Sequence, residues 1–138
     1  MVDLQNLSYA GVQVAHNFGA VAVVGGPALL LLAGASQSAL QRRVAWLVGG
    51  GWLLQILSGA GFGVVSFIGY GSLPDIHGIA IAALYIKVLC ALAGLVTALA
   101  LLGKAGVWSE RRRAHVWQLL LGLGFTALTA AAFLRWFS

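Results

Sequence analysis

Residues 70–104 read YGSLPDIHGIAIAALYIKVLCALAGLVTALALLGK, and this stretch decides the fold class of the chain. It opens with a polar turn and continues as a long apolar run with a single full charge, Lys87, near its middle. Such a run is typical of a transmembrane helix, which needs about 20 residues to cross the hydrocarbon core. Lys87 lies roughly 15 Å along this helix from His77, so we expect it deep in the membrane.

Lys87 is the first candidate functional residue. A charge at the bilayer centre costs about 3 kcal/mol even on a lenient insertion scale, and such residues usually face protein or a water-filled cavity. The residues on the same helical face are small or weakly polar, namely Ala80, Ala83, Cys90, Ala91, Gly94, Thr97 and Ala98. This face is therefore predicted to point into protein rather than lipid.

The composition agrees with a membrane protein. With 61% hydrophobic and 8% charged residues, the 138-residue chain has too little polar surface to cover a soluble globule. The net charge of +5 does not indicate a nucleic-acid partner, because the basic residues lie in short loops between apolar runs. Cys90 is the single cysteine, which excludes an intramolecular disulfide.

Four apolar runs are long enough to span the bilayer, at about 9–35, 44–70, 79–103 and 115–137. Short connections between them predict one all-α transmembrane domain over residues 1–138, an antiparallel four-helix bundle. The Gly25-Gly26-Pro27 triplet predicts a kink in the first span. Three tryptophans near predicted span ends are expected at the membrane interface: Trp108, Trp117 and Trp136.

Charge predicts the orientation of the bundle. The 36–43 and 104–114 loops are rich in Lys and Arg. The two termini and the 71–78 turn together contain a single Lys or Arg residue, Arg135. Because cytoplasmic loops are enriched in Lys and Arg, we expect those two loops inside and both termini outside. In a bacterium this places a multi-pass protein in the inner membrane with its termini in the periplasm.

The polar residues of the spans gather in the predicted outer half. His16 is either a histidine hydrogen-bonded to a neighbouring helix or an axial ligand to b-type haem or another metal. His77 is a turn residue or a second ligand that pairs with His16. His115 opens the last span on the inner side, where an interfacial position is expected.

Lys87 has no carboxylate at its own depth, because the only acids are Asp3, Asp75 and Glu110. Its predicted partner is a backbone or amide oxygen such as Gln55, water, or an anionic ligand. A haem propionate or a semiquinone is such a ligand.

Other chemistry is poorly supported. The chain has no acyl-transfer triad, no paired carboxylates at membrane depth and no glycine loop before a phosphate-binding lysine. No enzymatic reaction is assigned on this basis. Gly59 and Gly63 form a GxxxG pair, which indicates either tight helix packing or room for a flat cofactor.

Two stretches carry a resemblance. VAHNFGAVAVVGG (14–26) and YIKVLCALAGLVTALALL (85–102) resemble the first and third helices of CopD-like four-helix membrane domains, which are related to haem-binding bacterial protoporphyrinogen oxidases. This resemblance implies that His16 ligates haem b and that Lys87 is its paired lysine. Val24 stands where the family commonly has tryptophan, and the extension of the oxidase branch is missing, so oxidase activity is not implied.

The leading hypothesis is a membrane protein that binds b-type haem through His16, holds a propionate or quinone oxygen with Lys87, and takes part in electron transfer. An alternative is a non-catalytic accessory subunit of a larger respiratory or photosynthetic membrane complex, or a homo-oligomer, with structural histidines. Copper handling is a second alternative. The single methionine and single cysteine disfavour it, because copper pathways use soft sulfur ligands.

Overall fold

The computed structural model describes residues 3–138, and this part of the chain is almost entirely helical, without a strand. It contains four long helices and one short 3-10 turn: α1 (Leu4–Ala33), α2 (Ser38–Tyr70), α3 (Ile79–Lys104), η1 (Ala105–Val107) and α4 (Glu110–Phe137). All four long helices are long and apolar enough to cross a membrane. The predicted all-helical class and its four candidate membrane spans are thus confirmed.

Three helices begin before the predicted spans, at residues 4, 38 and 110 rather than 9, 44 and 115. Polar caps explain two of these differences. The Asp3 carboxylate accepts a hydrogen bond from the Gln5 amide, and the Ser109 hydroxyl accepts one from the Arg112 amide. A count of apolar residues locates the segment that suits the hydrocarbon core, whereas caps set the first helical turn.

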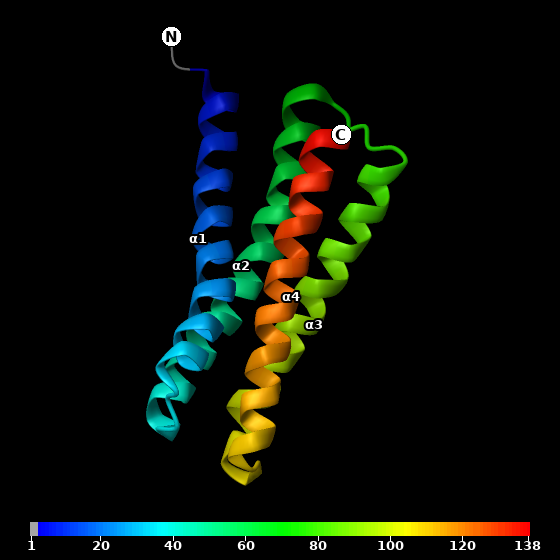
Figure 1. The fold of residues 1–138 in the computed structure, drawn as a ribbon. Helices are drawn as coiled ribbons and strands as arrows, with labels where there is room; N and C mark the ends of the chain where they lie inside the picture. Colours follow the sequence, from blue (N-terminus) through cyan, green and yellow to red (C-terminus); the bar gives the residue numbers. More distant parts are fainter. Residues whose placement is uncertain (1–2) are drawn as a thin grey trace.

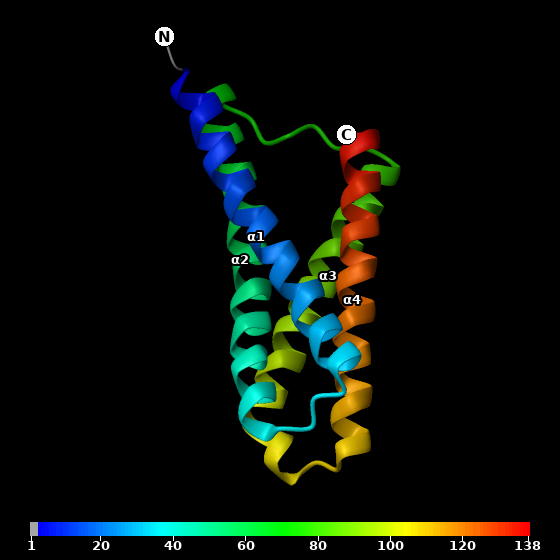
Figure 2. The same cartoon turned by 60° about the vertical axis from the view of Figure 1, so that its left-hand side comes forward.

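The helices form two closely packed pairs, α1 with α2 and α3 with α4, and contacts of α2 with α3 and of α1 with α4 join the pairs. Both termini and the 71–78 connection lie at one end of the bundle, and the other two connections lie at the opposite end (Figure 1). Figure 2 shows that the pairs diverge toward the end that carries the termini. Below, this end is called the terminal end and the opposite end the loop end.

Close approach of α1 and α2 depends on glycine. A Cβ atom at Gly51 would lie 2.9 Å from the Ala22 Cβ atom, and one at Gly26 would lie 2.6 Å from Val48 Cγ2. Pro27 is buried in the same contact, and α1 continues through the Gly25-Gly26-Pro27 triplet as one helix. Glycine at these positions lets the two backbones approach within van der Waals contact.

Most of the predicted inward face of α3 is buried, namely Ala80, Ala83, Cys90, Ala91, Gly94 and Ala98, whereas Thr97 is only partly buried. The large apolar residues of α3 on other faces are exposed, among them Val88, Leu89 and Val96. Trp52 from α2 packs directly on Gly94, where a Cβ atom would overlap the indole ring. The small residues of α3 thus admit large side chains from α2.

The expectation for Trp117 is wrong. Its side chain is only 2% exposed and belongs to the apolar core, whereas Trp136 is 83% exposed, as an interfacial residue would be. Both are near helix ends in sequence, but Trp117 lies on the face of α4 that packs against the other helices. Position along a helix does not distinguish an interfacial tryptophan from a core tryptophan, because the helical face decides the burial.

Candidate functional site

His16 on α1 and Lys87 on α3 meet inside the bundle, although 71 residues separate them in sequence. The Lys87 Nζ atom lies 2.9 Å from His16 Nε2. The His16 residue is 8% exposed and Lys87 is partly buried.

Ser58 on α2 fixes the orientation of the imidazole. His16 Nδ1 lies 2.7 Å from Ser58 Oγ, and that hydroxyl donates its only hydrogen to the Leu54 carbonyl oxygen. This bond to Leu54 assigns the hydroxyl oxygen as the acceptor of Nδ1–H, and in a neutral ring that tautomer leaves Nε2 as the acceptor. The ring thus directs a lone pair toward Lys87, whose ammonium group donates to it.

Two further residues of α2 complete the surroundings of His16. The Gln55 side-chain amide donates to the His16 backbone carbonyl oxygen. The Phe62 ring meets the imidazole edge-on, with 5.6 Å between ring centroids and an interplanar angle of 71°. Gly19 leaves room for Gln55, because a Cβ atom there would lie 2.8 Å from Gln55 Nε2.

The structure thus brings together three of the four candidate residues, His16, Gln55 and Lys87. Sequence reasoning missed Phe62, which lies four residues after Ser58 on the same face of α2. That spacing was a usable signal. The predicted partner of Lys87 was an oxygen atom, and here the structure differs, because the partner is an imidazole nitrogen.

The fourth candidate, His77, lies elsewhere. It is in the 71–78 connection, where its side chain is 79% exposed and its Nε2 atom lies 3.2 Å from Asp75 Oδ1. The predicted pairing of His16 with His77 is not formed. His115 is also exposed, and its Nδ1–H donates to the Arg111 carbonyl oxygen across 2.7 Å.

The donor set favours some metal groups over others. Within residues 3–138, no three His, Cys, Asp or Glu side chains are close enough to hold a metal ion together. A haem iron has four porphyrin nitrogens and needs only axial protein ligands. A neutral imidazole whose other nitrogen is held by a hydrogen bond is the usual arrangement of a metal-binding histidine. His16, with Nδ1–H held by Ser58, fits this requirement.

The Lys87 amine is the second nitrogen at the site, and it occupies the direction from which a metal would approach Nε2. A metal bound to Nε2 would lie about 2.0–2.1 Å from this nitrogen and use its lone pair. Metal binding would therefore replace the direct hydrogen bond between Lys87 and His16. The long stem of Lys87 permits such a movement without displacement of α3.

Comparison of the chain with protein families, with curated proteins and with solved structures found no match.

Proposed function

We propose that this chain is a membrane-embedded b-type haem protein that takes part in electron transfer, with His16 as the iron ligand. The observation that carries the proposal is the placement of the imidazole: Nδ1 lies 2.7 Å from Ser58 Oγ, and a ring that donates Nδ1–H to this oxygen presents the Nε2 lone pair to the interior. When bound, haem supplies a one-electron redox centre. Ser58 orients the ring, and Gln55 holds the backbone of α1 at the ligand.

Lys87 has two roles in this proposal. In the absence of a cofactor it donates to Nε2 and provides a polar partner for the imidazole within the bundle. With haem held by His16 Nε2, the Lys87 ammonium group would be available to bind a propionate or a quinone oxygen, because a buried cation needs a polar partner. His77 has no role at this site, since it is exposed and paired with Asp75.

The proposed setting is the inner membrane of a bacterium, with an antiparallel bundle and both termini in the periplasm. The basic residues in the helix turns next to the two loop-end connections support this orientation: Arg42, Arg43, Lys104, Arg111, Arg112 and Arg113. His16 then lies in the half of the membrane that is closer to the periplasm.

The test is an absorption spectrum of the protein purified in mild detergent, oxidised and then reduced with dithionite. We expect a b-type spectrum for the wild type, its loss in His16→Ala, and its retention in His77→Ala, which removes an exposed histidine. Lys87→Met is expected to retain haem with an altered midpoint potential. A featureless wild-type spectrum after expression with sufficient haem would refute the proposal.

An accessory-subunit function is the second candidate, and the glycines favour it. Six α-helical glycines leave open space where a side chain would begin, because a Cβ atom added there meets nothing within 4 Å in residues 3–138 apart from adjacent residues and the nearby backbone of its own helix: Gly11, Gly25, Gly50, Gly59, Gly103 and Gly122. Gly59 of the GxxxG pair is thus not used for packing between these four helices. Such small open surfaces suit close contact with another membrane helix.

Cross-linking in native membranes distinguishes the two candidates. A cysteine introduced at Gly59 should form a specific cross-link to another chain if the accessory function is right, and a cysteine at Leu32 serves as the control. Copper handling stays the last alternative. Copper that remains bound after desalting of the wild type, and is lost in His16→Ala, would favour it.

A further inference from the structure

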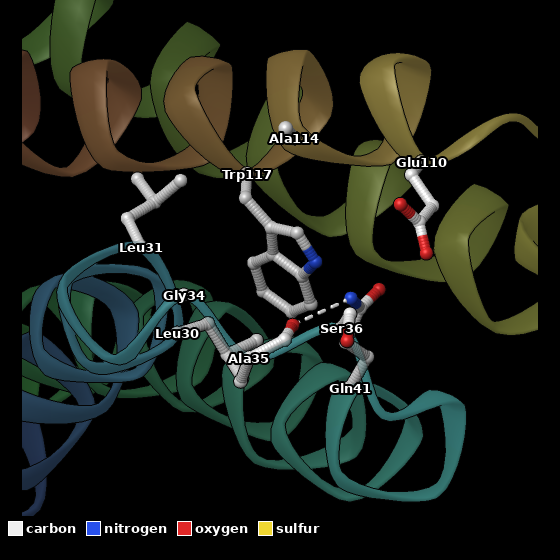
Figure 3. Close-up of a pocket in the computed structure, with 9 residues that line it drawn as sticks. All are labelled: Leu30, Leu31, Gly34, Ala35, Ser36, Gln41, Glu110, Ala114 and Trp117. Carbon is white, nitrogen blue, oxygen red and sulfur yellow. Dashed lines mark hydrogen bonds between the residues drawn. The ribbon is translucent and has the colours of Figure 1, made fainter.

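A pocket of about 220 Å³ lies at the loop end of the bundle, between the corner that joins α1 to α2 and the first turns of α4. Leu30, Leu31 and Trp117 form its apolar walls, and Gln41 and Glu110 contribute polar groups (Figure 3). The pocket is far along α1 from His16, so it is a separate site.

Two of the residues that line this pocket each carry a buried polar atom with no partner among the residues that the structure describes. These atoms are Trp117 Nε1, in a side chain that is 2% exposed, and Gln41 Oε1, in a residue that is 9% exposed. The Gln41 amide nitrogen donates to the Ala35 carbonyl oxygen across 2.9 Å, which holds the side chain in place (Figure 3). One donor and one acceptor thus lie buried and unpaired at the same pocket, an arrangement that calls for a partner.

The chemistry of the walls narrows the class of ligand. A hydroxyl group is the simplest partner for both atoms, because its oxygen accepts from Trp117 and its hydrogen donates to Gln41. The apolar walls require that the rest of the ligand be apolar, which a sugar or a glycerol head group is not.

The size and position of the pocket narrow the class of ligand further. A volume of about 220 Å³ is too large for one or two waters, each with about 30 Å³ in the liquid, and suits a single substituted ring. Leu30 and Leu31 border the pocket on the side of the membrane interior, since they precede the end of α1. An apolar tail attached to the ring has an apolar path toward the lipid.

We propose that this pocket binds the hydroxylated ring of a quinol, with one hydroxyl group between Trp117 Nε1 and Gln41 Oε1. Glu110 offers a carboxylate at the rim for a second hydroxyl group. The interpretation of the ring as a redox partner rests on the proposed electron-transfer function. Binding itself does not depend on haem, so the two proposals fail separately.

The experiment is equilibrium dialysis of trimethylhydroquinone, under anaerobic conditions, against the full chain in detergent, with empty micelles as the blank. We expect saturable binding to the wild type and about tenfold weaker binding to Trp117→Phe, which keeps an aromatic ring and removes the donor. Gln41→Leu, which removes the acceptor, should weaken binding by a similar factor. His16→Ala should bind like the wild type.

Trp52→Phe is the matched control, because Trp52 is also a buried tryptophan whose Nε1 has no partner in residues 3–138, but it packs on Gly94 outside the pocket. The affinity of Trp52→Phe for trimethylhydroquinone should stay within about twofold of the wild-type affinity. The ligand supplies a second test that needs no variant: the dimethyl ether of the same quinol should bind at least about tenfold more weakly. Absence of saturable binding, equal binding by Trp117→Phe and Trp52→Phe, or equal binding of the ether would overturn the proposal.

Discussion

Two polar clusters of the bundle differ in how their buried groups are satisfied. Near the terminal end, the imidazole, the hydroxyl and the ammonium groups of His16, Ser58 and Lys87 satisfy one another across three helices. Near the loop end, Trp117 and Gln41 keep one unpaired atom each beside a pocket. A network whose polar groups all have partners is stable without a ligand. Two buried atoms without partners, in contrast, would each gain a hydrogen bond from a bound ligand.

The comparison also concerns packing. The apolar core includes Trp52 of α2 and Trp117 and Leu120 of α4, which are almost fully buried. These residues lie where each helix packs against its neighbours in the bundle. Toward the terminal end the helix pairs diverge, and polar contacts join them instead (Figure 2). We therefore expect substitutions in the core to affect stability most and those in the 71–78 connection least.

Gly94→Ala should have the largest effect on stability. The new methyl group overlaps the Trp52 ring, and overpacking of this kind typically costs about 1–3 kcal/mol, here about 3 kcal/mol because three ring atoms are involved. Thermal unfolding in detergent measures the effect. Gly103→Ala is the control on the same helix, since nothing lies within 4 Å of its Cβ position, and equal melting temperatures for both variants would contradict the packing account.

Loss of His16 should come next. His16→Ala leaves the Lys87 ammonium and the Ser58 hydroxyl without their partner, which costs about 2 kcal/mol. The measurement is a double-mutant cycle with Lys87→Met. We expect the double variant to be more stable than His16→Ala alone, because it has no unpaired cation. Additive effects of the two substitutions would show that the residues do not interact.

Ser58→Ala should have a smaller effect, about 1 kcal/mol, because it removes the acceptor of His16 Nδ1–H but leaves Lys87 in place. The ring is then free to turn, so the reduced spectrum of a haem-bound protein should broaden and haem should dissociate faster. Ser66→Ala is the control on the same helix, since Ser66 is also buried but bonds to the Ser72 carbonyl oxygen. Faster haem loss in both variants would argue against a positioning role for Ser58.

The smallest effect is expected for Asp75→Asn. It removes the carboxylate that lies 3.2 Å from His77 Nε2, but both side chains are largely exposed, and exposed polar pairs contribute little to stability. Neither the melting temperature nor haem content should change measurably. A clear loss of haem would show that the 71–78 connection reaches the site.

Much of the fold follows from the sequence alone. The apolar runs locate four helices, and the small residues around Lys87 identify the inner face of α3. The predicted spans begin later than α1 and α4, because a count of apolar residues leaves out the turns that Asp3 and Ser109 cap. The burial of Trp117 was also not predicted. The sequence of α4 does not show how this helix is rotated about its axis relative to the helices that it packs against.

Part of the candidate site could be predicted from the sequence. His16, Gln55 and Lys87 are recognisable as polar residues in apolar surroundings, and each was a candidate for that reason. Their direct contact was not predictable, because depth counted along straight helices placed Lys87 deeper than His16. The pocket at Trp117 and Gln41 depends on which atoms lack partners, which only a three-dimensional structure reveals.

The order of synthesis gives the Lys87–His16 contact a consequence for membrane insertion. The α1 and α2 helices leave the ribosome before α3, so His16 and Ser58 are already present when Lys87 enters the bilayer. A lysine that arrives beside a waiting imidazole avoids part of the roughly 3 kcal/mol that a lone charge costs there. Biogenesis of the second helix pair therefore depends on the first, and a chain that begins at α3 should insert less completely than the intact protein.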